Sequence, residues 1–230
     1  MKYEVILFDA DETLFDFKKS EKEAFKNAML DFNIAYDENY HLKVYKEINT
    51  AIWKEFEQGL ITQKKLKVER FKRLSDKLNI NFDAANFAKS YMNHLADASF
   101  LYEDSTDLVE NLNNSYKLSI ITNGLISVQD KRIRQSTIAK YFDPIVISEE
   151  ILISKPDPKI FEHTLKHMNF SDKSKVLMVG DSLTSDIQGG INFGIDTCWY
   201  NPNKLKNETS IKPTYEISSF DELKSLLINS

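Results

Sequence analysis

Several features that would set this sequence apart from ordinary globular proteins are missing from it. Its single cysteine, Cys198, excludes an intrachain disulfide, and we expect that side chain to be a small core residue on a strand. No apolar run approaches the roughly 18 residues that a membrane-spanning helix needs. The short apolar run near the start is interrupted at Asp9 and lacks the features of a signal peptide. These absences predict a cytoplasmic protein.

An excess of positive charge is also missing. The chain has 30 Lys and Arg residues against 35 Asp and Glu residues, which gives a net charge of −5. A mildly acidic chain argues against nucleic acid or an anionic membrane as the main partner. A small anionic substrate stays compatible with this charge, because a site can be locally basic. We expect a monomer or a weak homo-oligomer that binds a small molecule.

Short apolar runs bounded by turn residues predict five strands. They cover residues 5–8, 118–121, 145–147, 176–179 and 195–199. Most of these runs show no polar alternation, as is typical of parallel strands covered on both faces. Helical patterns lie around residues 105–114, 126–137, 158–168 and 185–193, and a possible edge segment with a closing helix covers 215–228. This order predicts an α/β fold with a doubly wound parallel sheet of the Rossmann type.

The hundred or so residues between the first two strands carry helical patterns instead. Four apolar stripes at helical spacing are formed by Phe25, Met29 and Phe32, by Val44, Ile48, Ile52 and Phe56, by Val68, Phe71, Leu74 and Leu78, and by Ala84, Phe87, Tyr91 and Leu95. We predict an inserted four-helix cap domain of residues 16–98 and a core domain formed by residues 1–15 and 99–230.

Polar residues and glycine indicate where some of these helices begin and end. Ser20 with Glu23 fits a capping box, which predicts the start of the first helix near Ser20. Gly59 and Asn79 occupy positions where helices should end, because both residue types tolerate a left-handed backbone.

Acidic residues follow two of the predicted strands. Asp9 and Asp11 come directly after the first strand, and Asp181 and Asp186 follow the fourth. The carboxyl ends of parallel strands meet at one edge of the sheet, where open α/β folds bind ligands. Acidic oxygens from two strand ends suit a hard cation such as Mg²⁺. Considered singly, each cluster also fits a turn or a helix N-terminus, where Asp accepts hydrogen bonds from backbone amides.

Groups that can bind an anion follow the other two strands. The second strand ends in Thr122 and Asn123, and Lys155 lies between the third strand and a helix. Hydroxyl and backbone N–H groups can bind phosphate oxygens, and a lysine can neutralise their charge. Each feature alone also fits a helix cap or a solvated lysine. All four clusters at one edge predict a site that holds a phosphoryl group, attacks it and neutralises its charge.

With these motifs in this order, the chain resembles the haloacid dehalogenase-like hydrolase superfamily over its whole length. The helical insertion after the first motif resembles that of the subclass I members. The resemblance rests on Phe8-Asp9-Ala10-Asp11-Glu12-Thr13-Leu14, Thr122-Asn123-Gly124, Lys155-Pro156, and Gly180-Asp181 with Asp186. The chain also resembles the pyrimidine 5′-nucleotidase family in FDADETLF (8–15), IITNG (120–124), VISEE (146–150), GGIN (189–192) and Cys198-Trp199. That family hydrolyses nucleoside monophosphates.

The resemblance implies a phosphatase that works through an aspartyl-phosphate intermediate. Asp9 matches the nucleophile, and Asp11 matches the general acid that later activates water. Thr122, the backbone N–H of Asn123, and Lys155 match the groups that bind the phosphoryl oxygens.

The resemblance also implies a Mg²⁺ cofactor. Its ligands would be Asp9, the backbone carbonyl of Asp11, and Asp181. Asp186 matches a residue that orients Lys155 or a metal-bound water rather than binding the metal directly.

The substrate is the least determined part of this interpretation. Phe15, Phe17 and Trp53 are candidates to contact a base or sugar, although aromatic residues in helical stripes usually face a core, and we expect this of Trp53.

A sugar-phosphate phosphatase or phosphomutase is an alternative within the superfamily. A dehalogenase needs neither the second acid nor a metal, so Asp11 and Asp181 argue against it. An alternative of another class is a catalytically silent module that binds a phospho-ligand.

Overall fold

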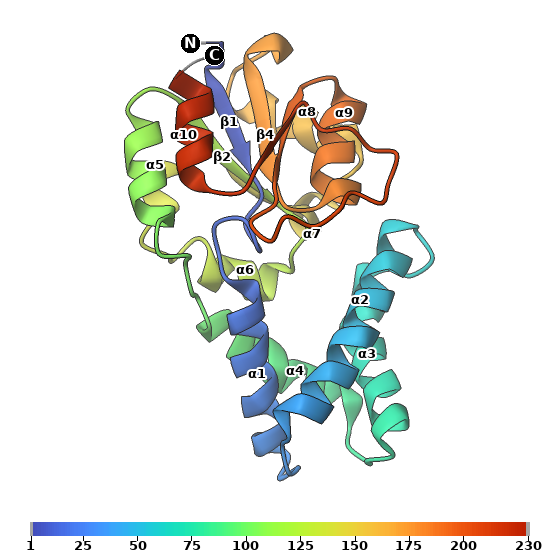
Figure 1. The fold of residues 1–230 in the computed structure, drawn as a ribbon. Coiled ribbons are helices and arrows are strands. Elements are labelled where there is room, and N and C mark those ends of the chain that lie inside the picture. Colours follow the sequence, from blue (N-terminus) through green and yellow to red (C-terminus); the bar gives the residue numbers. More distant parts are fainter. Residues whose placement is uncertain (1, 229–230) are drawn as a thin grey trace.

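The computed structural model describes residues 2–228 and contains a sheet of six parallel strands (Figure 1). Their order across the sheet is β3 (Ile145–Ile147), β2 (Lys117–Thr122), β1 (Val5–Phe8), β4 (Val176–Gly180), β5 (Asp196–Tyr200) and β6 (Tyr215–Ile217). The central strand β1 is buried along its whole length, which explains why its sequence is apolar without alternation. The doubly wound α/β prediction is confirmed, and Cys198 is buried on β5 as expected.

Helices cover both faces of this sheet. Those outside the insertion are α5 (Ser105–Asn113), α6 (Ile126–Arg132), α7 (Ser148–Ile151), α8 (Pro158–His167), α9 (Gln188–Phe193) and α10 (Phe220–Ile228). Figure 1 shows α5 and α10 on one side of the sheet and α8 and α9 on the other. Helix α6 ends at Arg132, five residues earlier than predicted. The backbone N–H and the hydroxyl of Ser136 both bond to the carbonyl of Ile133, which closes a turn in place of further helix.

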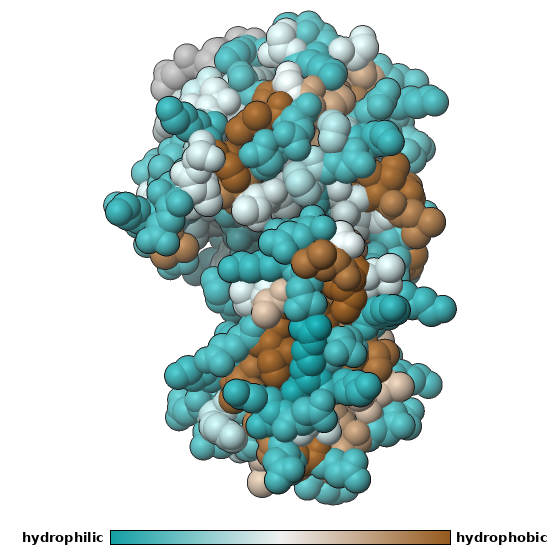
Figure 2. All heavy atoms as spheres, turned by 90° about the vertical axis from the view of Figure 1, so that its right-hand side faces the viewer, coloured by the Kyte–Doolittle hydropathy of each residue, from teal (hydrophilic) through white to brown (hydrophobic). Residues whose placement is uncertain are grey.

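Four long helices form the insertion between β1 and β2. They are α1 (Phe17–Asp31), α2 (Lys43–Glu57), α3 (Gln63–Leu78) and α4 (Ala84–Asp97). They extend from the carboxyl edge of the sheet (Figure 1), and the molecule turned by 90° shows the two parts meeting at a narrower middle (Figure 2). Side chains of the insertion form a hydrophobic cluster that also includes Leu125 and Val128 at the start of α6, and in it the rings of Phe25 and Tyr45 stack with centroids 4.6 Å apart.

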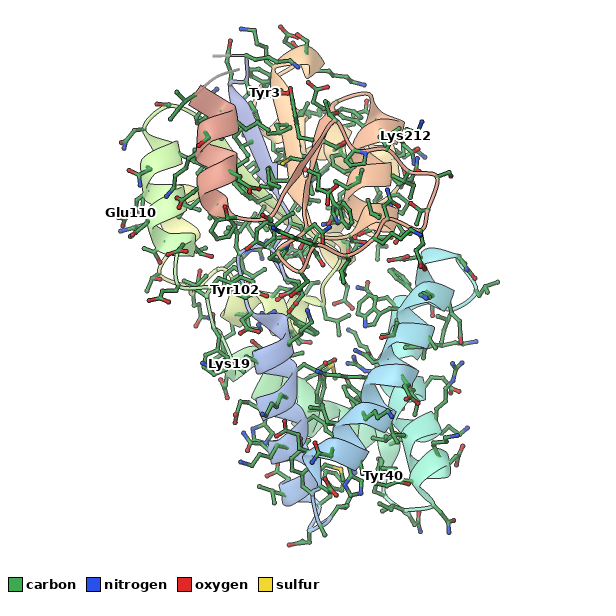
Figure 3. The ribbon with its side chains drawn as sticks, in the orientation of Figure 1. Tyr3, Lys19, Tyr40, Tyr102, Glu110 and Lys212 are labelled. Atoms are coloured by element: carbon green, nitrogen blue, oxygen red, sulfur yellow. The ribbon has the colours of Figure 1, made fainter. Side chains whose placement is uncertain are left out.

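The chain passes between the two parts twice, and the two crossing segments run side by side. The N–H of Asp16 donates to the carbonyl of Phe100 over 2.9 Å, and the N–H of Tyr102 donates to the carbonyl of Leu14 over 3.1 Å. Phe15 and Leu101 form an antiparallel bridge between these bonds. We call residues 14–17 and 98–102 the hinge; Figure 3 labels Tyr102 within it.

The predicted start of the first helix is wrong. Helix α1 begins at Phe17, and Asp16 is its N-cap because the Asp16 carboxylate accepts a 2.8 Å hydrogen bond from the N–H of Lys19. Ser20 lies one turn inside the helix and donates its hydroxyl to the carbonyl of Asp16. The expected ends are confirmed: Gly59 follows α2 with φ of +72°, and Asn79 caps α3 with φ of +54°.

The predicted apolar stripe on α3 is confirmed only in part. Phe71 is fully buried and stacks on Tyr45 with a centroid distance of 5.6 Å, whereas Val68 is 36% exposed. Phe71→Ala should therefore lower the free energy of unfolding by about 3–5 kcal/mol through loss of buried surface and the cavity left behind. Urea unfolding monitored by circular dichroism measures this. Val68→Ala on the same helix is the matched control, and an equal loss in both variants would contradict the packing described here.

Candidate active site

The loops that follow β1, β2 and β4 bring distant parts of the sequence together at the carboxyl edge of the sheet. Directly after β1, the N–H of Asp9 donates to the carbonyl of Val179 on β4 over 2.9 Å, which aligns the two strand ends. The chain then reverses within a few residues, and the N–H groups of Leu14 and Phe15 both donate to the carbonyl of Ala10 over 2.9 Å. This turn places two carboxylates at the edge before the chain enters the hinge.

A buried lysine lies at the centre of the site. The side chain of Lys155 is 1% exposed, and its ammonium group lies 2.6 Å from a carboxylate oxygen of Asp9 and 2.7 Å from one of Asp186. It also donates to the carbonyl of Ile121 at the end of β2 over 2.6 Å. Burial alone would lower the pKa of Lys155, but the carboxylates of Asp186 and Asp9 outweigh burial and raise it. Lys155 is therefore a fixed positive charge against Asp9.

The loop after β2 fixes the position of this lysine. The side chain of Asn123 accepts from the backbone N–H of Lys155 and donates to its carbonyl, both over 2.8 Å. The hydroxyl of Thr122 is buried and accepts a 3.1 Å hydrogen bond from the N–H of Gly124. The side chain of Asn123 thus positions Lys155, a contact that the sequence alone does not indicate.

Three carboxylates form an acidic cluster beside the lysine. Oxygen atoms of Asp9, Asp181 and Asp186 all lie within 4.8 Å of one another. Burial raises the pKa of Asp9 to about 7, and the carboxylates of Asp186 and Asp11 add to this against the effect of Lys155. Burial and the charges of Asp9 and Asp186 also raise the pKa of Asp181 well above its usual range. One ammonium cannot neutralise three carboxylates, two of them buried, so the donor set fits a hard divalent cation.

Asp11 forms an ion pair with a different cation, the guanidinium of Arg132. One of its carboxylate oxygens accepts a 2.6 Å hydrogen bond from Arg132, and the other accepts a 2.7 Å bond from the side-chain amide of Gln129. The same amide contacts the Thr122 hydroxyl at 3.3 Å. Sequence reasoning missed both residues of α6. The available signal was their spacing of three on a helix that directly follows the Thr122 motif, which puts them on one helical face.

A cavity of about 250 Å³ opens above these groups, between the sheet edge and the insertion. Asp9, Asp11 and Asp181 line it from the sheet edge, and the insertion contributes Phe17, Asn49, Trp53 and Arg70. The expectation that Trp53 packs in the core of the insertion is wrong, because Trp53 lines the cavity. The helical periodicity shows which residues share a face of the helix, but it does not show what that face contacts.

Phe15 does not reach this cavity. Its side chain is fully buried and packs in the hydrophobic cluster on one face of the sheet. Its suggested contact with a substrate base or sugar is therefore incorrect for this arrangement, because the turn after Asp11 directs the ring inward. Phe17, two residues later, does line the cavity.

Two sets of hydrogen bonds join the insertion to the sheet edge. The side-chain amide of Gln63 lies 3.3 Å from the carbonyls of both Asn123 and Gly124. The Thr184 hydroxyl donates to Glu57 over 3.1 Å. The insertion thus covers the site through bonds from α3 and from the end of α2.

A doubly wound sheet with a helical insertion after its first strand and a lysine among carboxylates at its carboxyl edge defines a class of hydrolases. The family model for the haloacid dehalogenase-like hydrolase matches residues 6–200. The chain belongs to this family.

Within the part that the structure describes, no helix is both long enough and apolar enough to cross a membrane.

Relatives match the chain over nearly its whole length. The pyrimidine 5′-nucleotidase YjjG of Escherichia coli is 35% identical, over 99% of this chain and 99% of that protein. The pyrimidine 5′-nucleotidase PynA of Streptococcus pneumoniae is 37% identical, over 99% of this chain and 96% of that protein. The crystal structure of the HAD-hydrolase YfnB of Bacillus subtilis, bound to magnesium, has a TM-score of 0.93 and 34% identity, covering 99% of both chains.

Magnesium should raise the melting temperature more at about pH 8 than at about pH 5.5. Because burial raises the folded-state pKa of Asp9 to about 7, the folded protein holds protons that the unfolded chain has already released above about pH 4. Without metal, the free energy of unfolding therefore falls as the pH rises from about 4 to about 7. A divalent cation competes with the same protons for the carboxylates, so it binds better at the higher pH. Melting curves with and without MgCl₂ at both pH values test this. A shift as large at the lower pH would contradict it.

Proposed function

We propose that the protein is a magnesium-dependent phosphomonoester hydrolase that works through an aspartyl-phosphate intermediate. The observation that carries this proposal is the buried contact of Lys155 with Asp9, beside Asp181 and next to a second carboxylate at Asp11. A nucleophile needs to be ionised and held; the Lys155 ammonium holds Asp9 and favours its ionised form, and a bound cation would favour that form further. The crystal structure of YfnB bound to magnesium supports the choice of metal.

In the first half-reaction, a carboxylate oxygen of Asp9 attacks phosphorus and the bond from phosphorus to the ester oxygen breaks. Asp11 gives its proton to the departing oxygen, so that an alcohol leaves. In the second half-reaction, Asp11 takes a proton from water, the water oxygen attacks phosphorus, and Asp9 is released with inorganic phosphate. The roles of Asp9 and Asp11 are assigned from their positions at the end of β1.

Other residues bind the charge that develops on the phosphoryl oxygens. We assign the Thr122 hydroxyl, the backbone N–H of Asn123 and the Lys155 ammonium to this role, because Thr122 and Asn123 line the cavity together with Asp9 and the ammonium contacts the Asp9 carboxylate. Asp9, the backbone carbonyl of Asp11, and Asp181 would hold Mg²⁺. The bound ion would neutralise the carboxylates and the phosphoryl group. Asp186 would orient Lys155, which it contacts at 2.7 Å.

We further propose that residues 16–98 act as a cap domain that selects a pyrimidine nucleoside 5′-monophosphate. Both nucleotidase relatives match the chain from end to end. The cavity wall supplied by the insertion combines the aromatic rings of Phe17 and Trp53 with the polar groups of Asn49 and Arg70. Aromatic rings stack on a flat base, and hydrogen-bond donors complement the carbonyl oxygens of a pyrimidine.

A sugar-phosphate phosphatase would use the same chemistry, and a phosphomutase would additionally need a bisphosphate activator. A sugar phosphate has no flat face to stack on the aromatic wall. A protein that only binds phospho-ligands would have no use for the second carboxylate at Asp11. The aromatic side of the cavity therefore favours the nucleotidase.

Asp9→Asn should abolish phosphatase activity while the melting temperature stays within a few degrees of wild type. The amide cannot attack phosphorus, although it fills the same volume beside Lys155. Release of phosphate from dUMP measures the activity. The control is Asp130→Asn, whose carboxylate lies on the surface against Arg134. Turnover by Asp9→Asn above a trace, with normal folding, would refute the nucleophile.

Trp53→Ala should lower kcat/KM for dUMP and dTMP by about 5- to 150-fold, the effect of losing about 1–3 kcal/mol of base stacking. The value for glucose 6-phosphate should change by less than about twofold, since this ester has no base. Tyr40→Ala, at the far end of the insertion (Figure 3), is the matched aromatic control. A wild-type enzyme that prefers glucose 6-phosphate over dUMP would refute the nucleotidase and leave the phosphatase mechanism standing.

A further inference from the structure

Arg132 is fully buried at the end of α6, where it contacts the second hinge segment. Its Nε donates to the carbonyl of Ala98 over 3.2 Å, and its own carbonyl accepts a 2.6 Å bond from the Ser99 hydroxyl. These two contacts attach the residue to the point where the chain leaves α4 and returns to the sheet. A change in the direction of this segment would move the guanidinium or break its bond to Ala98.

The same guanidinium contacts the first hinge segment. It lies over the rings of Phe15 and Phe17, with its central carbon 5.5 Å and 5.4 Å from their centroids. Phe15 belongs to the sheet cluster and Phe17 begins α1. Arg132 is thus packed between both crossings of the chain, and its cation–π contacts favour one arrangement of them.

The remaining bonds of Arg132 lead to Asp11. Its Nη1 donates to one carboxylate oxygen of Asp11 over 2.6 Å and to the side-chain carbonyl of Gln129 over 3.0 Å. Gln129 in turn donates to the other oxygen of Asp11 over 2.7 Å. Both oxygens of Asp11 are therefore held by a pair of side chains from α6, one of which is attached to the hinge.

We propose that Arg132 is a positioning residue that couples the orientation of the Asp11 carboxylate to the position of the hinge. The inference rests on the proposed function, in which Asp11 is the general acid. In a purely structural role, Arg132 would stabilise the hinge and affect every substrate alike. As a positioning residue for the acid, it affects only reactions in which the leaving oxygen needs a proton.

Two esters separate these roles. The alcohol released from dUMP is a poor leaving group that needs protonation, whereas the p-nitrophenolate released from p-nitrophenyl phosphate is stable as an anion. Because kcat/KM includes only steps up to release of the alcohol, it reports the half-reaction in which Asp11 acts as an acid. The comparison therefore isolates the positioning of Asp11 from the binding of phosphate.

Arg132→Met should lower kcat/KM for dUMP by about 10- to 100-fold and for p-nitrophenyl phosphate by less than about threefold. In an Asp11→Asn background, the same substitution should change the dUMP value by less than about twofold, because the group that it positions is already gone. Equal losses on the two esters, or losses that multiply in the double variant, would overturn the proposal.

Arg132→Lys keeps the positive charge and serves if Arg132→Met does not fold. A lysine has one side-chain nitrogen and cannot bond to the Ala98 carbonyl and to Asp11 with separate nitrogens. We therefore expect the same loss of kcat/KM, confined to dUMP. An equal loss on both esters would overturn the proposal. Arg134→Met is the matched control, since Arg134 pairs with Glu150 away from the cavity. If wild type hydrolyses neither ester, the proposed function itself fails; if it hydrolyses both, the variants test Arg132 alone.

Discussion

The buried ammonium group of Lys155 is the interaction on which the rest of the site depends. Removing a lysine from water costs several kcal/mol, and the cost is offset only by close, well-directed partners. Asp9 after β1, the carbonyl of Ile121 near the end of β2, and Asp186 in the segment after β4 supply them. Burial raises the pKa of Asp9, and the neighbouring carboxylates add to this. Because the partners include more negative charge than one ammonium neutralises, the site favours a further cation.

The strand order makes this arrangement possible. Strands β3, β2, β1 and β4 are adjacent and parallel, so the loops that follow them open at the same edge. Residues 146 positions apart, Asp9 and Lys155, then meet without any local sequence signal. The insertion leaves from the loop after β1, which places its helices over the edge where the acidic cluster lies, and its hydrophobic cluster continues into α6 through Leu125 and Val128.

Much of this could be predicted from the sequence, because strand ends and helical stripes are local patterns. The five strands, the four helices of the insertion and the convergence of the motifs follow from them. The contacts of Asp11 with Gln129 and Arg132 could not be predicted, since they join residues more than a hundred positions apart through side chains usually found on surfaces. The place of Trp53 was missed because periodicity shows which residues share a face, but not what the face contacts.

Asp9 and Asp11 are two residues apart, yet different cations hold them. Lys155 is a compact charge fixed between strand ends, which suits a nucleophile that needs to stay aligned with phosphorus. Arg132 has a planar fork whose separate nitrogens reach Asp11 and a hinge carbonyl at once. In the proposed mechanism, the group that forms the covalent bond is therefore anchored to the rigid sheet, and the group that transfers the proton is anchored to the segment through which the insertion is attached. This division links acid catalysis to the part of the protein that selects the leaving group.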